Sequence, residues 1–97
     1  MKKTEYFNKV LGVVSELAEV SKESVLSKNR AANVVDARWI VIKLLKDAGF
    51  STNDIAELIC HKRRTIYNAF SLIEDRIKYS YNDSGNILAT ARQLLKD

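Results

Sequence analysis

The sequence contains no proline, three glycines and a single cysteine, and each shortage narrows what the chain can form. Because proline is the strongest helix breaker, its absence permits long helices along nearly all of the 97 residues. One cysteine cannot close a disulfide within the chain. There is no early apolar run of the signal-peptide kind, and no stretch approaches the roughly 20 apolar residues of a membrane span. We therefore expect a cytoplasmic protein without a membrane partner.

Side chains that carry catalysis or bind metals are equally scarce. Cys60 and His61 are the one cysteine and the one histidine, and as sequence neighbours their side chains diverge, with no third catalytic group beside them. Two such ligands are too few for a metal site. A glycine-rich phosphate loop is absent as well. The sequence therefore predicts no enzyme, no metal, no cofactor and no nucleotide, and favours a binding protein.

Positive charge is concentrated in two segments. The net charge is +4, residues 22–46 hold six cations against two anions, and residues 62–64 add three adjacent cations. The remainder of the chain is slightly acidic. Such clustering is what a focused field toward a polyanion requires, but a basic helix start can also be a solvated surface. The charge pattern alone leaves both interpretations open.

Apolar periodicity predicts an all-α domain of about five to six helices, formed by residues 1–97 as a single unit around one small core. We expect an N-terminal amphipathic helix over about 4–20 and a C-terminal helix over about 86–96. The apolar positions of the first are Tyr6, Val10, Val14 and Leu17, and those of the last are Ile87, Ala91, Leu94 and Leu95.

The middle of the chain combines a basic loop with the expected central helix. Ser21 can cap a short turn with Ser24, and residues 27–33 have no strong periodicity. The helix that follows is apolar around most of its circumference and is stopped by Gly49. Arg38 breaks the apolar pattern, so this arginine either pairs with a buried carboxylate or reaches a charged partner at the edge of the domain.

A helix-turn-helix is predicted over about 51–79. Ser51 with Asp54 is a capping-box-like start for a short helix, and the chain breaks around Cys60 and His61. The second helix carries polar residues on one face and an apolar stripe on the other. The stripe consists of Ile66, Phe70, Ile73 and Ile77, and the polar face of Arg64, Asn68, Ser71 and Asp75.

The second helix of a helix-turn-helix enters the major groove by its N-terminal end. Arginine can grip guanine through two hydrogen bonds, asparagine can do so for adenine, and a threonine methyl can contact thymine. Cations in a first helical turn are unfavourable by about 0.3 to 1 kcal/mol each, so three of them are easier to understand if an anion binds there. The residues at this end are Lys62, Arg63, Arg64, Thr65 and Asn68.

The segments VLSKNR, ARWIVIKLLKDAGFSTNDIAEL and TIYNAFSLI, in this order, resemble the C-terminal DNA-binding domain of the bacterial replication initiator DnaA, over roughly Val20 to Lys78. The resemblance implies a fold of the Trp-repressor and DnaA C-terminal kind, double-stranded DNA as the partner, and a role in replication or transcription regulation. It also implies that Lys28 and Arg30 enter the minor groove. By the same resemblance, the DNA backbone would be contacted by Arg38, Lys46 and Ser51.

The sequence departs from the family at the positions that determine DNA-sequence specificity. The family signature of glycines followed by Arg-Asp-His-Thr-Thr corresponds here, with one residue fewer, to residues 60–65, and only the final threonine is retained. Lys62 replaces an acidic residue that can accept from cytosine, and Arg63 replaces a histidine. The 97 residues do not include the family's ATPase region. We therefore expect a target other than the standard DnaA box.

These predictions define a candidate DNA interface with two groups of residues. Base reading is assigned to Arg30, Arg63, Arg64, Thr65 and Asn68, and backbone contacts to Lys28, Arg38, Lys46, Ser51 and Lys62. Since one such domain makes few phosphate contacts, tight binding would need a homodimer, formed through the C-terminal apolar stripe, or a protein partner.

The rival hypothesis is a helical interaction module that binds an acidic protein partner and has lost sequence-specific DNA reading. The altered reading residues favour it. An RNA-binding role has less support, because single-stranded RNA readers present stacking aromatics, whereas Tyr67 and Phe70 are expected on the core side of their helix.

Overall fold

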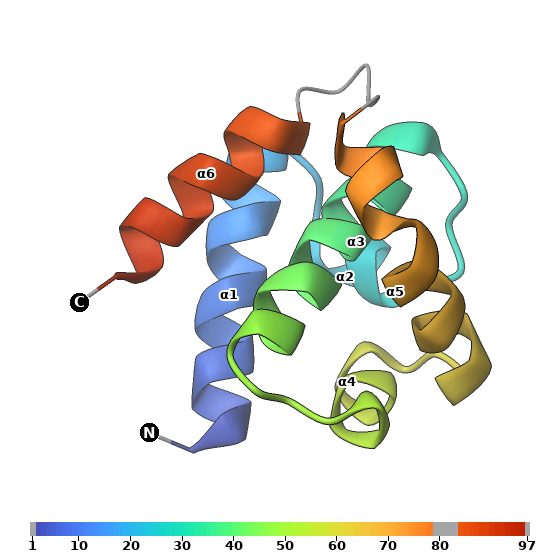
Figure 1. The fold of residues 1–97 in the computed structure, drawn as a ribbon. Coiled ribbons are helices and arrows are strands. Elements are labelled where there is room, and N and C mark those ends of the chain that lie inside the picture. Colours follow the sequence, from blue (N-terminus) through green and yellow to red (C-terminus); the bar gives the residue numbers. More distant parts are fainter. Residues whose placement is uncertain (1, 79–83, 97) are drawn as a thin grey trace.

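Six helices make up the part of the chain that the computed structural model describes, residues 2–78 and 84–96 (Figure 1). They are α1 (Lys3–Ala18), α2 (Lys22–Leu26), α3 (Ala32–Asp47), α4 (Thr52–Ile59), α5 (Arg63–Lys78) and α6 (Ser84–Leu95). The predicted all-α class with five to six helices is confirmed. Residue 79, the predicted end of the helix-turn-helix, lies outside the described residues, as do residues 1 and 97. None of the helices within the described ranges is long and apolar enough to cross a membrane.

Helix α3 is the centre of the fold. α1 and α6 lie on one side of it and α5 on the other, and α2 and α4 also pack against it (Figure 1). Ile40, Val41 and Leu45 of α3 have no exposed surface (0%). Burying a side chain of this size stabilises the fold by about 1.5–3 kcal/mol relative to leaving it in water. The apolar character of α3 around most of its circumference therefore reflects burial on several sides.

The helix ends follow the capping signals of the sequence. The Oγ atoms of Ser21 and Ser51 accept hydrogen bonds from the backbone N–H groups of Ser24 and Asp54, both at 3.1 Å. These bonds confirm the predicted caps of α2 and α4. Gly49 follows α3 with a φ of +95°, a conformation that glycine adopts without steric cost, so the predicted stop is confirmed as well.

The two outer helices begin and end one or two residues away from their predicted bounds. α1 ends at Ala18 because Glu19 takes a left-handed conformation (φ 56°), which stops the helix before residue 20. α6 spans Ser84–Leu95 instead of 86–96. Its apolar stripe faces α1 and α3, and only Leu94 of that stripe is largely exposed, at 53%. The stripe therefore stabilises the domain itself.

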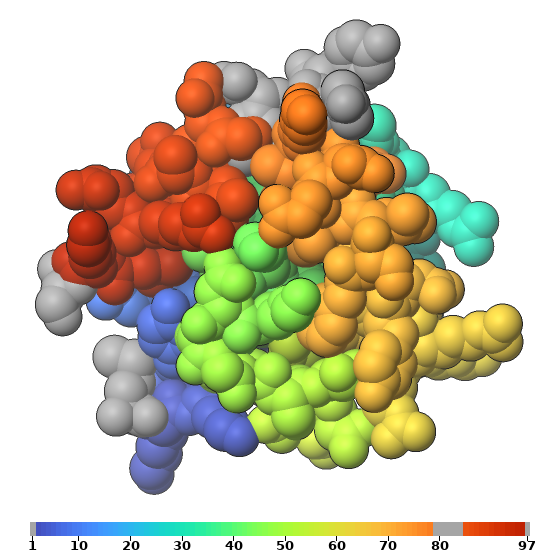
Figure 2. All heavy atoms as spheres, in the orientation of Figure 1, coloured from blue at the N-terminus to red at the C-terminus, as the bar shows by residue number. Residues whose placement is uncertain are grey.

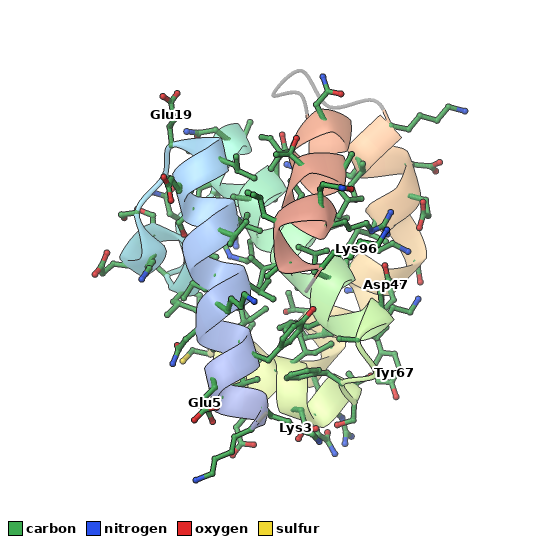
Figure 3. The ribbon with its side chains drawn as sticks, turned by 90° about the vertical axis from the view of Figure 1, so that its left-hand side faces the viewer. Lys3, Glu5, Glu19, Asp47, Tyr67 and Lys96 are labelled. Carbon is green, nitrogen blue, oxygen red and sulfur yellow. The ribbon has the colours of Figure 1, made fainter. Side chains whose placement is uncertain are left out.

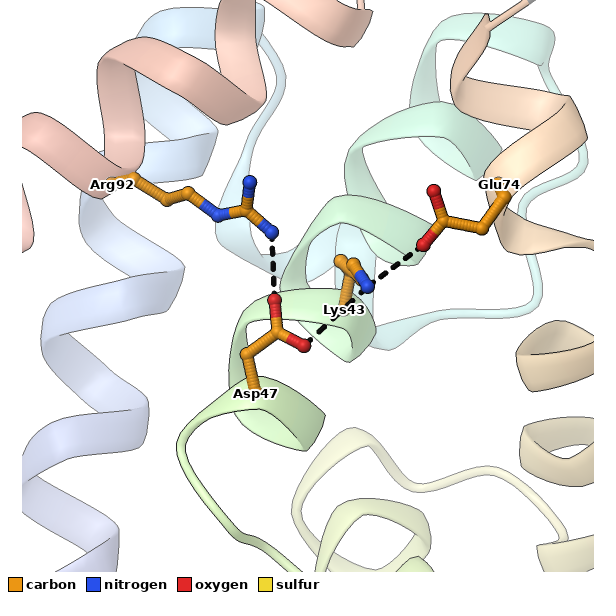
Figure 4. A network of polar contacts seen from close by, with 4 residues as sticks. All are labelled: Lys43, Asp47, Glu74 and Arg92. Atoms are coloured by element: carbon orange, nitrogen blue, oxygen red, sulfur yellow. Dashed lines mark hydrogen bonds and ion pairs between the residues drawn. The ribbon is translucent and has the colours of Figure 1, made fainter.

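An ion-pair network joins α3 to the helices on either side of it (Figure 4). Lys43 of α3 lies 2.8 Å from Glu74 of α5 and 3.4 Å from Asp47, and Arg92 of α6 lies 2.7 Å from Asp47. The hydrogen bond with Glu74 raises the pKa of Lys43 above its ordinary value. Because Glu74 is largely exposed, water screens this pair. The network therefore fixes which faces of the three helices meet more than it adds stability.

Candidate nucleic-acid interface

Helices α4 and α5 form a helix-turn-helix. Figure 1 shows α4 nearly end-on below α5, which runs up the page, so the two helices cross. Ile55 and Ile59 of α4 and Ile66 of α5 have no exposed surface (0%) and belong to one core cluster. Ala56 is also buried, and its small side chain allows the helices to approach closely. The apolar contact fixes how the start of α5 is presented at the surface.

The turn between α4 and α5 is tight because Cys60 takes a left-handed conformation, with a φ of 64°. The N–H groups of Cys60 and His61 donate to the carbonyl oxygens of Glu57 and Ala56, at 3.3 and 3.1 Å, and so close the end of α4. The left-handed conformation costs a residue with a Cβ atom about 1–2 kcal/mol. The side chain of Cys60 is exposed.

The predicted reading residues lie on exposed surface at the start of α5. All five are exposed: Lys62, Arg63, Arg64, Thr65 and Asn68. The Nη1 atom of Arg63 donates to Oδ1 of Asn53 at 3.0 Å, which holds this guanidinium against the first turn of α4. The start of α5 therefore offers donors and acceptors to a ligand, with Arg63 already oriented by α4.

The basic loop between α2 and α3 is held by its own side chains. Ser27 Oγ accepts a hydrogen bond from the N–H of Asn29 at 3.1 Å, and Asn29 Oδ1 accepts from the N–H of Ala31 at 2.8 Å. Turns of this kind fix the backbone locally. Lys28 and Arg30 are exposed, so the loop carries both of its cations on the outside.

Two hydrogen bonds connect the basic loop to the turn of the helix-turn-helix. Lys28 Nζ donates to the carbonyl oxygen of Cys60 at 3.5 Å, and His61 Nε2 lies 3.0 Å from the carbonyl oxygen of Ser27. Since a carbonyl oxygen can only accept, Nε2 carries the proton in this bond. In Figure 2, atoms of the loop (turquoise) and of the α4–α5 turn (yellow) project from the same side of the molecule. The fold thus brings together the two basic segments of the sequence.

The surroundings of Arg38 differ from both interpretations that its place in the sequence suggested. Arg38 is 6% exposed, and among the described residues its hydrogen-bond partners are uncharged backbone groups instead of a carboxylate or another charged side chain. Its guanidinium donates to four backbone carbonyl groups at 2.8–3.2 Å: those of Ser24, Val25, Ser27 and Asn29. Burial lowers the pKa of Arg38 below its ordinary value, although arginine stays charged at neutral pH. A side chain so covered offers little surface to a phosphate.

His61 is the titratable group at the junction of loop and turn. Burial lowers the pKa of its imidazole below 6.5, the charges of Arg38 and Lys28 act in the same direction, and the bond to Ser27 opposes them. The neutral ring is therefore favoured at pH 7. A sequence pattern gives no sign of this role, because the partner of His61 is a backbone carbonyl 34 residues away.

Lys46 and Ser51 border the helix-turn-helix. Both are exposed, and the Nζ atom of Lys46 lies 4.7 Å from the centre of the Phe70 ring, which joins the end of α3 to α5. Ser51 caps α4, so its hydroxyl lies at the N-terminal end of that helix. The structure therefore leaves both side chains at the surface next to α4 or α5.

Tyr67 is a candidate contact residue that the sequence interpretation missed. The prediction that Tyr67 lies on the core side of α5 is wrong, because Tyr67 is 57% exposed. It lies at the edge of the molecule opposite α1 (Figure 3). Phe70 is half-buried and meets the Tyr67 ring edge to face, with centres 6.4 Å apart. At about 100° per residue, Tyr67 falls between Phe70 and the outward-facing Ser71. A helical projection of the sequence could therefore have identified Tyr67 as partly exposed.

Among the described residues, no group of three or more histidine, cysteine, aspartate or glutamate side chains could hold a metal ion. Comparison of the chain with protein-family models, with curated proteins and with solved structures gave no match. The resemblance to the DnaA domain therefore stays a prediction from the sequence.

Proposed function

We propose that the protein binds double-stranded DNA, with the start of α5 in the major groove and the loop between α2 and α3 in the neighbouring minor groove. One observation carries the proposal. Exposed cations from two segments distant in the sequence are held together on one side of the molecule by hydrogen bonds between loop and turn. These cations are Lys28, Arg30, Lys62, Arg63 and Arg64. A polyanion with regularly spaced phosphates is the partner that such a surface fits.

Base reading is assigned to the outward face of α5 and to Arg30. Arg64 and Asn68 lie one helical turn apart on that face, and their side-chain types can bond guanine and adenine edges. Thr65 would contact a thymine methyl, and Arg63 would reach a neighbouring base or phosphate from its position beside α4. Arg30 would enter the minor groove.

Phosphate contacts are assigned to Lys28, Lys46, Ser51 and Lys62. The amide groups at the start of a helix attract anions, which favours a phosphate near Ser51 at the start of α4. Arg38 is left out of this group because it is 6% exposed and its donors face carbonyl oxygens. The contacts would set the register of α5 on the duplex without selecting a sequence.

The role that we propose in the cell is regulation of replication or transcription by a DnaA C-terminal-like domain that reads a site of its own. The role rests on the resemblance of residues 20–78 to the DnaA domain in the sequence. The replaced residues at the α4–α5 turn support a changed target.

A second candidate function is binding of an acidic protein partner. It is favoured by the exposure of Tyr67 (57%) and Leu72 (54%), which add apolar surface to the helix that begins with the cations. Protein interfaces are enriched in tyrosine at their centres. Duplex DNA offers the thymine methyl as its main apolar group in the major groove and gives less reason for the exposed leucine.

The deciding experiment is selection from a randomised duplex pool, followed by affinity measurements across salt concentrations. We expect one short motif to be enriched, with a steep decrease of affinity as salt rises. The test variant is Arg63→Ala/Arg64→Ala. The matched control is Lys22→Ala/Lys96→Ala, which removes the same charge from exposed positions, one whose side chain lies next to Gly12 of α1 and one that follows α6.

The proposal requires the test variant to lose the enriched motif and to flatten the salt dependence, while the control keeps both. Binding no tighter than about 10⁻⁴ M, without enrichment and without an effect of the test variant, would contradict DNA binding. The second candidate function would then be the better explanation of the cations.

A further inference from the structure

The guanidinium of Arg38 is the main connection between the basic loop and the body of the domain. Two of its four carbonyl partners, Ser24 and Val25, belong to α2, and the other two, Ser27 and Asn29, belong to the loop. The last carbonyl groups of a helix have no partner within the helix. Arg38 therefore bonds both the end of α2 and the backbone on either side of Lys28.

Apart from Arg38, the loop is held by hydrogen bonds of its own side chains and by its bonds to the α4–α5 turn. Residues 28–33 are all exposed, so this stretch lacks a buried apolar anchor. Its other hydrogen bonds among the described residues include that of Ser27 Oγ to the Ser24 carbonyl at 2.7 Å, the turns made by Ser27 and Asn29, and the two bonds to the α4–α5 turn. Ser27 is the shared point, because its carbonyl oxygen accepts from both Arg38 and His61.

We infer that Arg38 is a positioning residue for DNA binding: without touching DNA, it holds the basic loop so that Lys28 and Arg30 reach the minor groove while α5 occupies the major groove. The inference rests on the proposed function. It replaces the direct backbone contact that the DnaA resemblance implies for this arginine.

Arginine suits this position because its planar fork presents several N–H donors in fixed directions. Lysine keeps the charge but presents its donors from one small ammonium group. Arg38→Lys therefore cannot reproduce the bonds to α2 and to the loop together. Arg38→Lys therefore tests the geometry of the guanidinium alone, whereas Arg38→Ala would remove the geometry and the charge together.

The experiment is a double-mutant cycle in the full chain, measured at a temperature where unfolding curves show every variant to be folded. Arg38→Lys is combined with Lys28→Ala/Arg30→Ala, which removes the loop cations, and separately with Arg64→Ala, which alters α5. Arg76→Lys is the matched control. Arg76 is a partly buried arginine of α5 that bonds Asp36 of α3 at 2.7 Å and lies over the Trp39 ring. The probe is the duplex selected from the random pool.

We expect Arg38→Lys to weaken binding by about tenfold, a coupling within the range for residues that share one network. In the background without the loop cations, the same change should alter affinity by less than about twofold. Combined with Arg64→Ala, the two losses should add. Arg76→Lys should bind like the unaltered chain.

Additive losses in the Lys28→Ala/Arg30→Ala background would overturn the inference, since a direct phosphate contact or a general loss of structure acts whether or not the loop cations are present. Failure of the unaltered chain to bind duplex DNA would instead remove the proposed function, and the inference with it. If Arg38→Lys does not fold, His61→Ala replaces it, because it removes another bond to the Ser27 carbonyl. Its loss must also vanish without the loop cations.

Discussion

Arg64 and Lys62 are exposed cations two residues apart, but we expect Arg64 to contact bases and Lys62 to contact phosphates. Arg64 lies on the outward face of α5, beside Asn68, whereas Lys62 lies in the turn before the helix. We predict that Arg64→Ala weakens binding to the preferred site by about 1–3 kcal/mol and relaxes its specificity. Lys62→Ala should weaken all duplexes alike and reduce the salt slope by about 1. Titrations on the selected and on a scrambled duplex measure both effects.

Equal losses on both duplexes for both variants would contradict this division between reading and positioning. So would an unchanged salt slope for Lys62→Ala.

Tyr67 gives a prediction at an exposed aromatic side chain. Because it is 57% exposed and packs on Phe70 by one edge, Tyr67→Ala should lower the free energy of unfolding by about 1 kcal/mol or less. If the ring lies against the DNA, the same change should weaken duplex binding at least tenfold, that is, by about 1.4 kcal/mol. Denaturant unfolding and duplex titration separate the two quantities.

Leu72→Ala is the matched control, since Leu72 is 54% exposed and lies further along α5. An equal loss of DNA affinity for both variants would show that Tyr67 makes no particular contact. Unaltered DNA affinity in Tyr67→Ala, with lost capture of an acidic peptide, would favour the protein-interaction function.

Single residues also show where prediction from the sequence ends. The exposure of the α5 cations follows from helical periodicity, because the apolar residues of the same segment define which face of the helix is buried. The environment of Arg38 does not, because its partners are backbone carbonyl groups, which every residue carries and no pattern distinguishes.

At the scale of elements, α4 offers a test of its cap. Ser51→Ala should lower the free energy of unfolding by about 1 kcal/mol, because the N–H of Asp54 loses its acceptor. Ser51→Asp and Ser51→Asn should keep the cap and most of the stability. If a phosphate lies near the start of α4, only the aspartate should repel it. We therefore expect Ser51→Asp to weaken duplex binding and Ser51→Asn to leave it nearly unchanged.

Stability is measured by denaturant unfolding and affinity by duplex titration at low salt. Similar affinities for the aspartate and asparagine variants would exclude a phosphate near Ser51.

The starts of α2 and α4 could be predicted because capping is local: a serine oxygen and an N–H three residues later are enough. The end of α1 could not, since Glu19 takes a left-handed conformation that residues other than glycine adopt only under the constraint of the surrounding fold. The contact between the basic loop and the α4–α5 turn was also beyond local patterns. It depends on how α2, α3 and α4 pack, which determines which distant carbonyl groups His61 and Lys28 meet.

At the scale of the whole molecule, His61 links stability to pH. Its pKa is lower in the folded chain than the ordinary value of 6.5, so the unfolded chain binds a proton first as the pH falls. The contribution of His61 to stability is therefore complete above about pH 6.5 and is lost as the pH decreases toward the folded-state pKa. We expect the free energy of unfolding to decline from about pH 7 to about pH 5, measured by denaturant titration.

His61→Gln is the control, because glutamine does not titrate and still carries an N–H donor for Ser27. It should remove most of the decline over this range. The lowered pKa values of Asp54 and Glu74 act at more acidic pH and should not interfere. A decline of the same size in His61→Gln would place the responsible group elsewhere.

Cys60, the single cysteine of the chain, lies exposed at the α4–α5 turn and next to both basic segments. A maleimide dye would therefore attach at one defined place, with no need to introduce or remove any other thiol. The label would lie beside the proposed docking surface while the helices of the core remain unmodified. Its emission or anisotropy would give the association and dissociation rates of the duplex directly, without any substitution in the sequence.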